Sequence, residues 1–372
     1  MFGRALETPV VLSSAFGFAD AEHAAATFRG EGDSYIYGRW GNPTTDALER
    51  ALAALEGAEA ACATASGMAA ISGALLSILE AGDHVVAPRA LYAETARLFR
   101  ERLPRLGITT TFVDATEPGS FEKAITANTR VLYIETPANP TLGIVDIAEV
   151  VSLARAKKLL TVADNTFATP FSQTPLALGV DVVVHSATKG IGGHGDTIAG
   201  AICGSKERIV AAADVAIKGF GGVISPLAAF LVTRGIKTFA LRQRAACANA
   251  AGLAERLATH PRVKVVRHPS LPDHPRREVA LRQMHAFGTL LSFEVATLEE
   301  GRKVLEAVRT ITHAVSLGDT RSLLVHPAST THSTMPAETR QLAGVGDGLL
   351  RLSVGIESLD DLWADLEQAL AR

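Results

Sequence analysis

Short apolar runs without polar alternation, separated by helical stretches, are the feature of this chain that most constrains its fold. A strand that is apolar on both faces needs cover on both sides, and this is typical of a mostly parallel sheet between layers of helices. We therefore predict an α/β protein. The runs that we interpret as strands are 84–87, 109–113, 130–135, 159–163 and 180–185, and the helices between and around them are 44–55, 68–79, 91–103, 121–125 and 147–157.

The pattern changes on either side of this segment. Residues 1–40 contain turn formers and little periodicity, which indicates an extended arm. Beyond about residue 240, the longer helical stretches 240–259, 298–308 and 360–370 surround the strand-like 263–267 and 289–295. A chain of 372 residues is long enough for about two domains. We expect an arm over 1–40, a large domain over 41–239 and a smaller C-terminal α/β domain over 240–372.

Composition excludes several classes of protein. The net charge is −3 with interspersed charges, so no basic face that would favour nucleic acid is indicated. Ala60–Leu79 is uncharged and long enough to cross a membrane, but its serines and glycines favour a turn followed by a buried helix. The three cysteines, Cys62, Cys203 and Cys247, are widely spaced, which argues against disulfides or a zinc cluster. With no signal peptide indicated, we expect a cytoplasmic protein without a metal site.

Two strand ends carry the residues that point to chemistry. Asp164 follows the apolar run 159–163, and Lys189 follows the run that ends near His185. Ligands of parallel α/β sheets bind at the carboxyl ends of the strands, so both residues should face one crevice. Pyridoxal 5′-phosphate (PLP) needs a lysine for a Schiff base and an acid beside its ring nitrogen. Lys189 and Asp164 match these two requirements.

A phosphate group would need donors nearby. Ser66, Gly67 and Met68 open a predicted helix, where free N–H groups favour an anion. Ser186 and Thr188 add hydroxyl groups beside the lysine. Taken alone, Ser66 is also explained as an ordinary helix N-cap.

Gly190–Gly195 also matches the glycine pattern of dinucleotide sites. Such a site would need a helix directly after the glycines and an acid at the end of the next strand. The residues that follow, 196–202, have the composition of a strand instead. We therefore favour a loop that leaves room for another cofactor over a nicotinamide site.

With these residues in place, the chain resembles the cysteine/methionine-metabolism (trans-sulfuration) family of PLP enzymes. The family includes methionine γ-lyase, cystathionine γ-lyase and γ-synthase, and the O-acylhomoserine sulfhydrylases. The resemblance implies the aspartate aminotransferase type I fold and a homo-oligomer, a tetramer built as a dimer of dimers with active sites shared between subunits. It is carried by the ordered stretches 37–44, 66–70, 135–140, 162–166, 185–189, 234–238, 316–319, 326–329 and 351–355.

The resemblance also implies roles for further residues. Tyr37 and Arg39 would reach the phosphate, and Tyr37 also the substrate, in a neighbouring subunit's site. Tyr92 would stack on the cofactor ring and act as an acid or base. The resemblance further implies that Asn139 lies beside the ring hydroxyl and that Ser316 and Arg351 bind the substrate α-carboxylate.

Sequence features of the family members point to two different reactions for this chain. γ-Elimination on methionine, homocysteine or cystathionine would give 2-oxobutanoate, ammonia and a thiol, whereas γ-replacement would make the protein an O-acetyl- or O-succinylhomoserine sulfhydrylase. Val315 and 193–196 resemble methionine γ-lyases, but Glu94 stands where those enzymes typically have cysteine, and 318–322, with Arg321, resembles the sulfhydrylases. We expect a carbon–sulfur γ-lyase. A nicotinamide oxidoreductase and a catalytically inactive relative are the alternatives from other classes.

Overall fold

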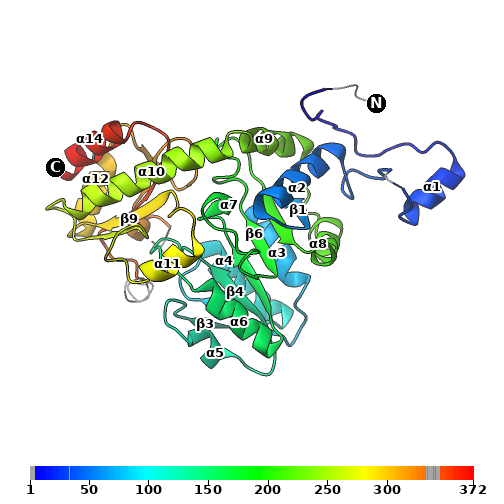
Figure 1. Cartoon of the computed structure of the whole chain (residues 1–372), viewed down its shortest axis with the longest axis horizontal. Helices are drawn as coiled ribbons and strands as arrows, with labels where there is room; N and C mark the ends of the chain where they lie inside the picture. Colours follow the sequence, from blue (N-terminus) through cyan, green and yellow to red (C-terminus); the bar gives the residue numbers. More distant parts are fainter. Residues whose placement is uncertain (1–4, 33, 332, 334–337, 339, 341–343) are drawn as a thin grey trace.

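The computed structural model describes residues 5–32, 34–331, 333, 338, 340 and 344–372. Residues 1–4 and 33 of the predicted arm lie outside this set. Two separate sheets organise the chain, a seven-stranded one in the first two thirds and a five-stranded one near the C-terminus (Figure 1).

The seven-stranded sheet confirms the prediction of a mostly parallel α/β fold. Its order is β1–β7–β6–β5–β4–β2–β3, and β7 alone runs antiparallel to its neighbours. The carboxyl ends of β4, β5 and β6 therefore meet at one edge. The strands are β1 (Ala60–Thr64), β2 (His84–Pro88), β3 (Thr109–Val113), β4 (Thr129–Glu135), β5 (Leu160–Asp164), β6 (Val182–His185) and β7 (Gly200–Gly204).

Helices cover both faces of this sheet, which explains its apolar strands. Ala163 and Val183 face one hydrophobic cluster, and Val162, Val182 and Val184 face the other. Helices α2 (Pro43–Glu56), α5 (Ser120–Ala124), α6 (Ile147–Lys157) and α9 (Pro226–Ile236) contribute to the first cluster. Helices α3 (Gly67–Leu76), α4 (Ala93–Arg97) and α8 (Lys206–Ala213) contribute to the second, with the π-helical turns η1 (Leu98–Arg102) and η3 (Asp214–Gly219) and the 3₁₀ turn η2 (Leu103–Leu106).

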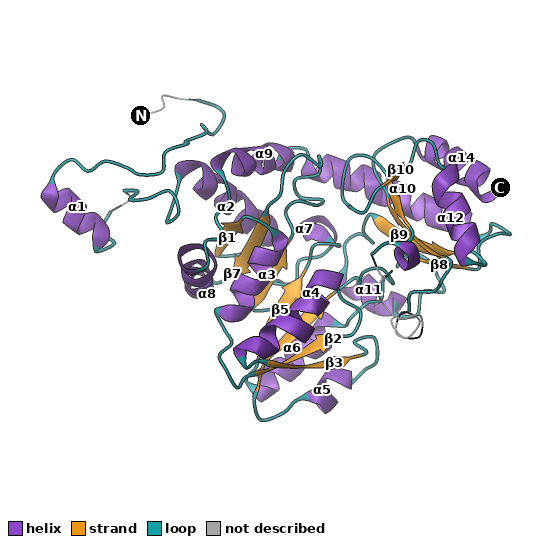
Figure 2. Ribbon diagram, turned by 180° about the vertical axis from the view of Figure 1, so that it is seen from behind, coloured by secondary structure: helices purple, strands orange, loops and turns teal. Residues whose placement is uncertain are grey.

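The five-stranded sheet has the order β10–β11–β12–β9–β8 and a core of its own. Figure 2 shows α10, α12 and α14 beside it. The strands are β8 (Val265–Arg267), β9 (Leu290–Glu294), β10 (Thr312–His313), β11 (Leu323–Val325) and β12 (Leu349–Ser353). The helices are α10 (Phe239–Ala258), α12 (Leu298–Ala307) and α14 (Leu359–Leu370), while α7 (Thr169–Ser172), α11 (Arg277–Gln283) and the 3₁₀ turn η4 (Pro327–Ser329) lie in connections.

The N-terminal segment projects away from both sheets (Figure 1). It is not extended throughout, because it carries the helix α1 (Ala21–Phe28), which Asp20 caps by accepting the His23 N–H. Apolar side chains along the segment lie open to solvent, with Leu6 100% and Leu12 77% exposed.

Two local predictions were wrong. Residues 60–64 form the strand β1 rather than a turn. The strand pairs with β7 and packs against α2, and its lack of charge is equally typical of a buried strand and of a buried helix. The helix predicted over 91–103 is shorter, since α4 passes into a π-helical turn and then a 3₁₀ turn that contains Pro104. None of the helices in the described ranges combines the length and the apolar character needed to span a membrane.

Candidate active site

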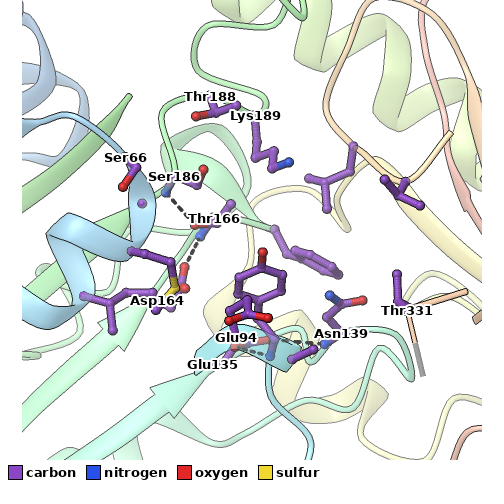
Figure 3. Close-up of a pocket in the computed structure, with 18 of the residues that line it drawn as sticks. Ser66, Glu94, Glu135, Asn139, Asp164, Thr166, Ser186, Thr188, Lys189 and Thr331 are labelled. Carbon is purple, nitrogen blue, oxygen red and sulfur yellow. Dashed lines mark hydrogen bonds between the residues drawn. The ribbon is translucent and has the colours of Figure 1, made fainter. Parts of the chain in front are cut away.

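A pocket of about 460 Å³ lies at the carboxyl ends of β4, β5 and β6 (Figure 3). A pocket of this size suits a cofactor or a small ligand. Its wall contains most of the residues singled out from the sequence: Ser66, Gly67, Met68, Tyr92, Asn139, Asp164, Ser186, Thr188, Lys189 and Arg351. A second cavity of about 450 Å³ adjoins it, shares Thr188, Ile198 and Leu317 with it, and is also lined by Ser316.

Asp164 ends β5 and places a buried carboxylate at the floor of the pocket. Its Oδ1 accepts the backbone N–H of Thr166 at 3.0 Å, while the side chain is only 8% exposed. Burial raises the pKa of Asp164, which Thr166 and the nearby His185 lower in part. Because a desolvated carboxylate is stabilised by a cationic N–H donor, this site fits the ring nitrogen of PLP.

Lys189 enters the pocket from the turn that follows β6, and Figure 3 shows its side chain directed into the cavity. Its Nζ donates to Ser316 Oγ at 3.0 Å. Burial, and secondarily the charge of Arg351, lowers the pKa of the Lys189 amine. A lysine with a lowered pKa is more often neutral and therefore nucleophilic, as the chemistry of a Schiff base requires.

The start of α3 forms a cradle whose size depends on glycine. A Cβ at Gly67 would lie 2.7 Å from the Cβ of Ser186. A side chain there would close the gap between α3 and the turn after β6 that carries Lys189, called the lysine turn below. Ser66 caps α3 by accepting the N–H of Ala69 at 3.1 Å. This combination of a helix start, a glycine and the Ser186 hydroxyl fits a phosphate. The Thr188 hydroxyl donates to Ala199 O at 3.0 Å and accepts the Ala199 N–H at 2.9 Å, so in this arrangement its proton is used within the protein and does not face a phosphate.

Arg351 lies on β12 and brings a buried guanidinium from the second sheet to the pocket. It donates to Asn139 Oδ1 at 3.0 Å and to Ser316 O at 3.1 Å. Its Nε is buried and has no partner among the described residues. Burial lowers the pKa of Arg351 to about 10. A buried cation with an unsatisfied N–H at a pocket wall is suited to bind a carboxylate.

Glu135 was not recognised as a site residue from the sequence, although it ends β4 and the strand-end rule applies to it. Its carboxylate accepts the Tyr92 N–H at 3.0 and 3.1 Å and the Asn139 N–H at 3.3 Å. It pairs with Asp164 across β4 and β5. Burial, and secondarily the nearby Asp164, raises the pKa of Glu135 to about 8. Glu135 therefore holds the backbones of two other lining residues in place.

Tyr92 precedes α4 and is 43% exposed at the pocket. Burial raises the pKa of its phenol, with Glu94 the next largest contribution. The pocket also contains residues to which the sequence assigned no role, since their types are apolar or common: Ile71, Ala93, Thr166, Phe167, Ile198, Leu317 and Thr331.

Tyr37 and Arg39 do not line this pocket. Tyr37 forms an isolated bridge with Ala15, and Arg39 donates to the carbonyl oxygen of Lys218. Both lie near the root of the projecting N-terminal segment, and Tyr37 is 43% exposed.

The glycine loop 190–195 does not have the structure of a dinucleotide site. It is followed by the strand β7 rather than by a helix. A Cβ at Gly193 would lie 1.6 Å from Arg242 Nη1, and one at Gly318 would lie 2.4 Å from the N of Gly190. These glycines therefore allow close packing around the lysine turn.

Comparisons with known proteins agree with this geometry. The family model described as "Cys/Met metabolism PLP-dependent enzyme" matches residues 3–371. The chain is 47% identical over 370 residues to an L-methionine γ-lyase of Fusobacterium nucleatum subsp. polymorphum, covering 99% of this chain and 94% of that one. It is 43% identical to an O-succinylhomoserine sulfhydrylase of Mycobacterium tuberculosis (strain CDC 1551 / Oshkosh), covering 97% and 90%.

Among solved structures, a cystathionine γ-synthase of Xanthomonas oryzae pv. oryzae, in complex with aminoacrylate and cysteine, superposes with a TM-score of 0.93. The two sequences are 40% identical, and the match covers 99% of this chain and 93% of that one. This similarity extends over both sheets.

Proposed function

The chain belongs to the Cys/Met metabolism family of PLP-dependent enzymes, and from this premise we propose that it is a carbon–sulfur γ-lyase. Its substrates would be of the methionine, homocysteine and cystathionine type, and its products 2-oxobutanoate, ammonia and a thiol. The observation that carries the proposal is the full-length similarity to L-methionine γ-lyases together with Asp164, Lys189 and Arg351 in one pocket.

The cofactor would be held at both ends of its ring. Asp164 would bond the ring nitrogen and Lys189 would bind the aldehyde carbon, with Asn139 beside the ring hydroxyl and Tyr92 against the ring face. Ser66, Gly67, Met68, Ser186 and Thr188 would surround the phosphate. When bound, PLP supplies an electron-withdrawing ring that stabilises negative charge at the substrate Cα.

The chain's own residues would orient the substrate and move its protons. Arg351, with its unsatisfied Nε, would bind the α-carboxylate, and Ser316 would lie beside it. Once released, Lys189 would take the α-proton, and its lowered pKa keeps the amine neutral and able to accept it. Tyr92 would serve as a second acid or base near the leaving group.

Two residues of the N-terminal segment would act in a neighbouring subunit. Tyr37 and Arg39 lie outside the pocket of their own chain, on a segment that exposes apolar side chains. We propose that they complete a neighbour's site, Tyr37 towards the substrate and both towards the phosphate, within a homotetramer made of two dimers. We also propose a cytoplasmic location, which the three free cysteines fit.

O-Acylhomoserine sulfhydrylase is the second candidate. The similarity to an O-succinylhomoserine sulfhydrylase supports it. The same pocket would then release an acyl group and accept sulfide in its place.

Release of 2-oxobutanoate by the purified PLP-bound protein tests the proposal. Methionine, cystathionine and O-acetylhomoserine are supplied in turn, each with and without sulfide, and Lys189→Ala serves as the inactive control. Oxo-acid from the thioethers is the expected result. If O-acetylhomoserine alone reacts, and sulfide diverts it to homocysteine, the enzyme is a sulfhydrylase and the γ-lyase assignment is wrong.

A further inference from the structure

Among the charged residues that line the pocket, acidic side chains outnumber cationic ones. Two are cationic, Lys189 and Arg351, and three are acidic, Glu94, Glu135 and Asp164. Both cations are bonded to groups of the protein, Lys189 to Ser316 Oγ and Arg351 to Asn139 and Ser316. The proposed function further assigns Lys189 to the cofactor and Arg351 to the α-carboxylate. Neither is then available for a second anion on the substrate.

Two of the three acids are also bonded to groups of the protein, and the third is not. Glu135 accepts backbone N–H groups and Asp164 accepts the N–H of Thr166, so both are buried and occupied. Glu94 is exposed, and within the described part of the chain its carboxylate has no hydrogen bond or ion pair. Arg97, three residues later, is close enough to interact with its charge but forms its ion pair with Glu101, so the Glu94 carboxylate stays unpaired at the pocket.

Glu94 lies where the outer part of a substrate would extend. It belongs to the first turn of α4, two residues after Tyr92, and its charge is close enough to contribute to the raised pKa of Tyr92. Figure 3 shows it on the same side of the pocket as Glu135 and Asn139, with Lys189 on the opposite side of the view. Val315 and Ile198 also line the pocket and are 62% and 65% exposed, which marks its mouth as apolar.

We propose that Glu94 is a specificity-determining residue that disfavours substrates whose γ-substituent ends in a carboxylate without an ammonium group beside it. A neutral thioether or acetyl ester meets apolar side chains at the mouth, and a distal ammonium group would be attracted to Glu94. A succinyl ester would bring its free carboxylate against Glu94, with no unassigned cation among the described lining residues to compensate. This inference rests on the proposed site but not on whether elimination or replacement follows.

The test compares two esters that differ in one carboxylate. The kcat/KM values for O-acetyl- and O-succinylhomoserine are measured for the PLP-bound wild type, Glu94→Gln and Glu94→Lys. Changes in Tyr92 affect both esters alike and cancel in their ratio. We expect Glu94→Gln to raise the relative value for the succinyl ester about two- to fivefold and Glu94→Lys to raise it about tenfold, with smaller effects in high salt.

Glu80→Gln is the matched control, since Glu80 is exposed and does not line the pocket. It should leave the ratio unchanged. An unchanged ratio in Glu94→Lys would overturn the inference. If neither ester turns over, the ratio of their dissociation constants, from the absorbance of the bound cofactor, decides the same question. Failure on methionine would count against the γ-lyase assignment alone.

Discussion

Arg242 is a buried cation that fixes the position of the turn behind Lys189. It lies in the first turn of α10 and is 6% exposed. Burial lowers the pKa of its guanidinium, which Asp319 partly offsets. The guanidinium donates to Gly190 O at 2.9 Å, Ile191 O at 3.0 Å, Gly235 O at 2.9 Å and Thr238 Oγ1 at 3.2 Å.

Arg242→Lys keeps the charge and removes the planar fork. An ammonium group on a straight chain can reach one or two of these acceptors, so at least two hydrogen bonds to buried groups are lost. Each is charge-assisted and contributes about 1.5 to 2 kcal/mol, which gives a loss of about 3 to 4 kcal/mol in the free energy of unfolding. Because Gly190 follows Lys189 directly, the lysine turn loosens as well, and the protein retains PLP less tightly.

Chemical denaturation with and without excess PLP measures both effects. Arg244→Lys is the control, since Arg244 is exposed on the same helix. Arg242→Lys should lose stability in both conditions and release more cofactor on gel filtration, whereas Arg244→Lys should match the wild type. A loss below about 1 kcal/mol would refute the assignment of Arg242 as the clamp of this turn.

Three further predictions concern the site. Asp164→Ala should lose most turnover while still binding some PLP, and undiminished rates would remove Asp164 from the ring nitrogen. Arg39→Ala should weaken PLP retention, and a wild-type chain that is monomeric and fully active would disprove the shared site. Glu135 has a pKa near 8, above its unfolded value, so its stabilising effect is complete below about pH 4 and is lost as the pH rises through about 8. When the pH is raised from about 6 to about 9, the melting temperature of PLP-free Glu135→Gln should therefore fall by less than that of the PLP-free wild type. An equal fall in both proteins would contradict this.

The strand ends were the most predictable part of the site. Buried parallel strands have a simple sequence pattern, and their carboxyl ends must share one edge. This was enough to predict that Asp164 and Lys189 lie in one pocket, and it would also have found Glu135 had the rule been applied to β4. The helix starting at Gly67 was similarly visible from its cap and glycine.

Other features could not be read from local pattern. The strand β1 has a sequence, Ala60–Thr64, that suits a buried helix equally well, and only its pairing with β7 decides between them. Helix α1 is short and lies on a segment with few contacts to the sheets, so periodicity gives a weak signal. The use of the Thr188 hydroxyl proton depends on its hydrogen bond to Ala199 O, eleven residues away in the chain.

The network of hydrogen bonds around Arg351 links the two halves of the chain at the point where substrate would bind. Asn139 and Lys189 belong to the first sheet's edge, while Arg351 is on β12 and Ser316 precedes β11. Arg351 bonds Asn139 and Ser316, and Ser316 accepts from Lys189, so one side chain joins residues on both sides of the pocket. A shift of the second sheet would alter the Lys189 amine and the carboxylate site together. Substitutions at Ser316 and Arg351 should therefore combine non-additively, because Arg351 holds the Ser316 backbone carbonyl and thereby positions the hydroxyl that accepts from Lys189.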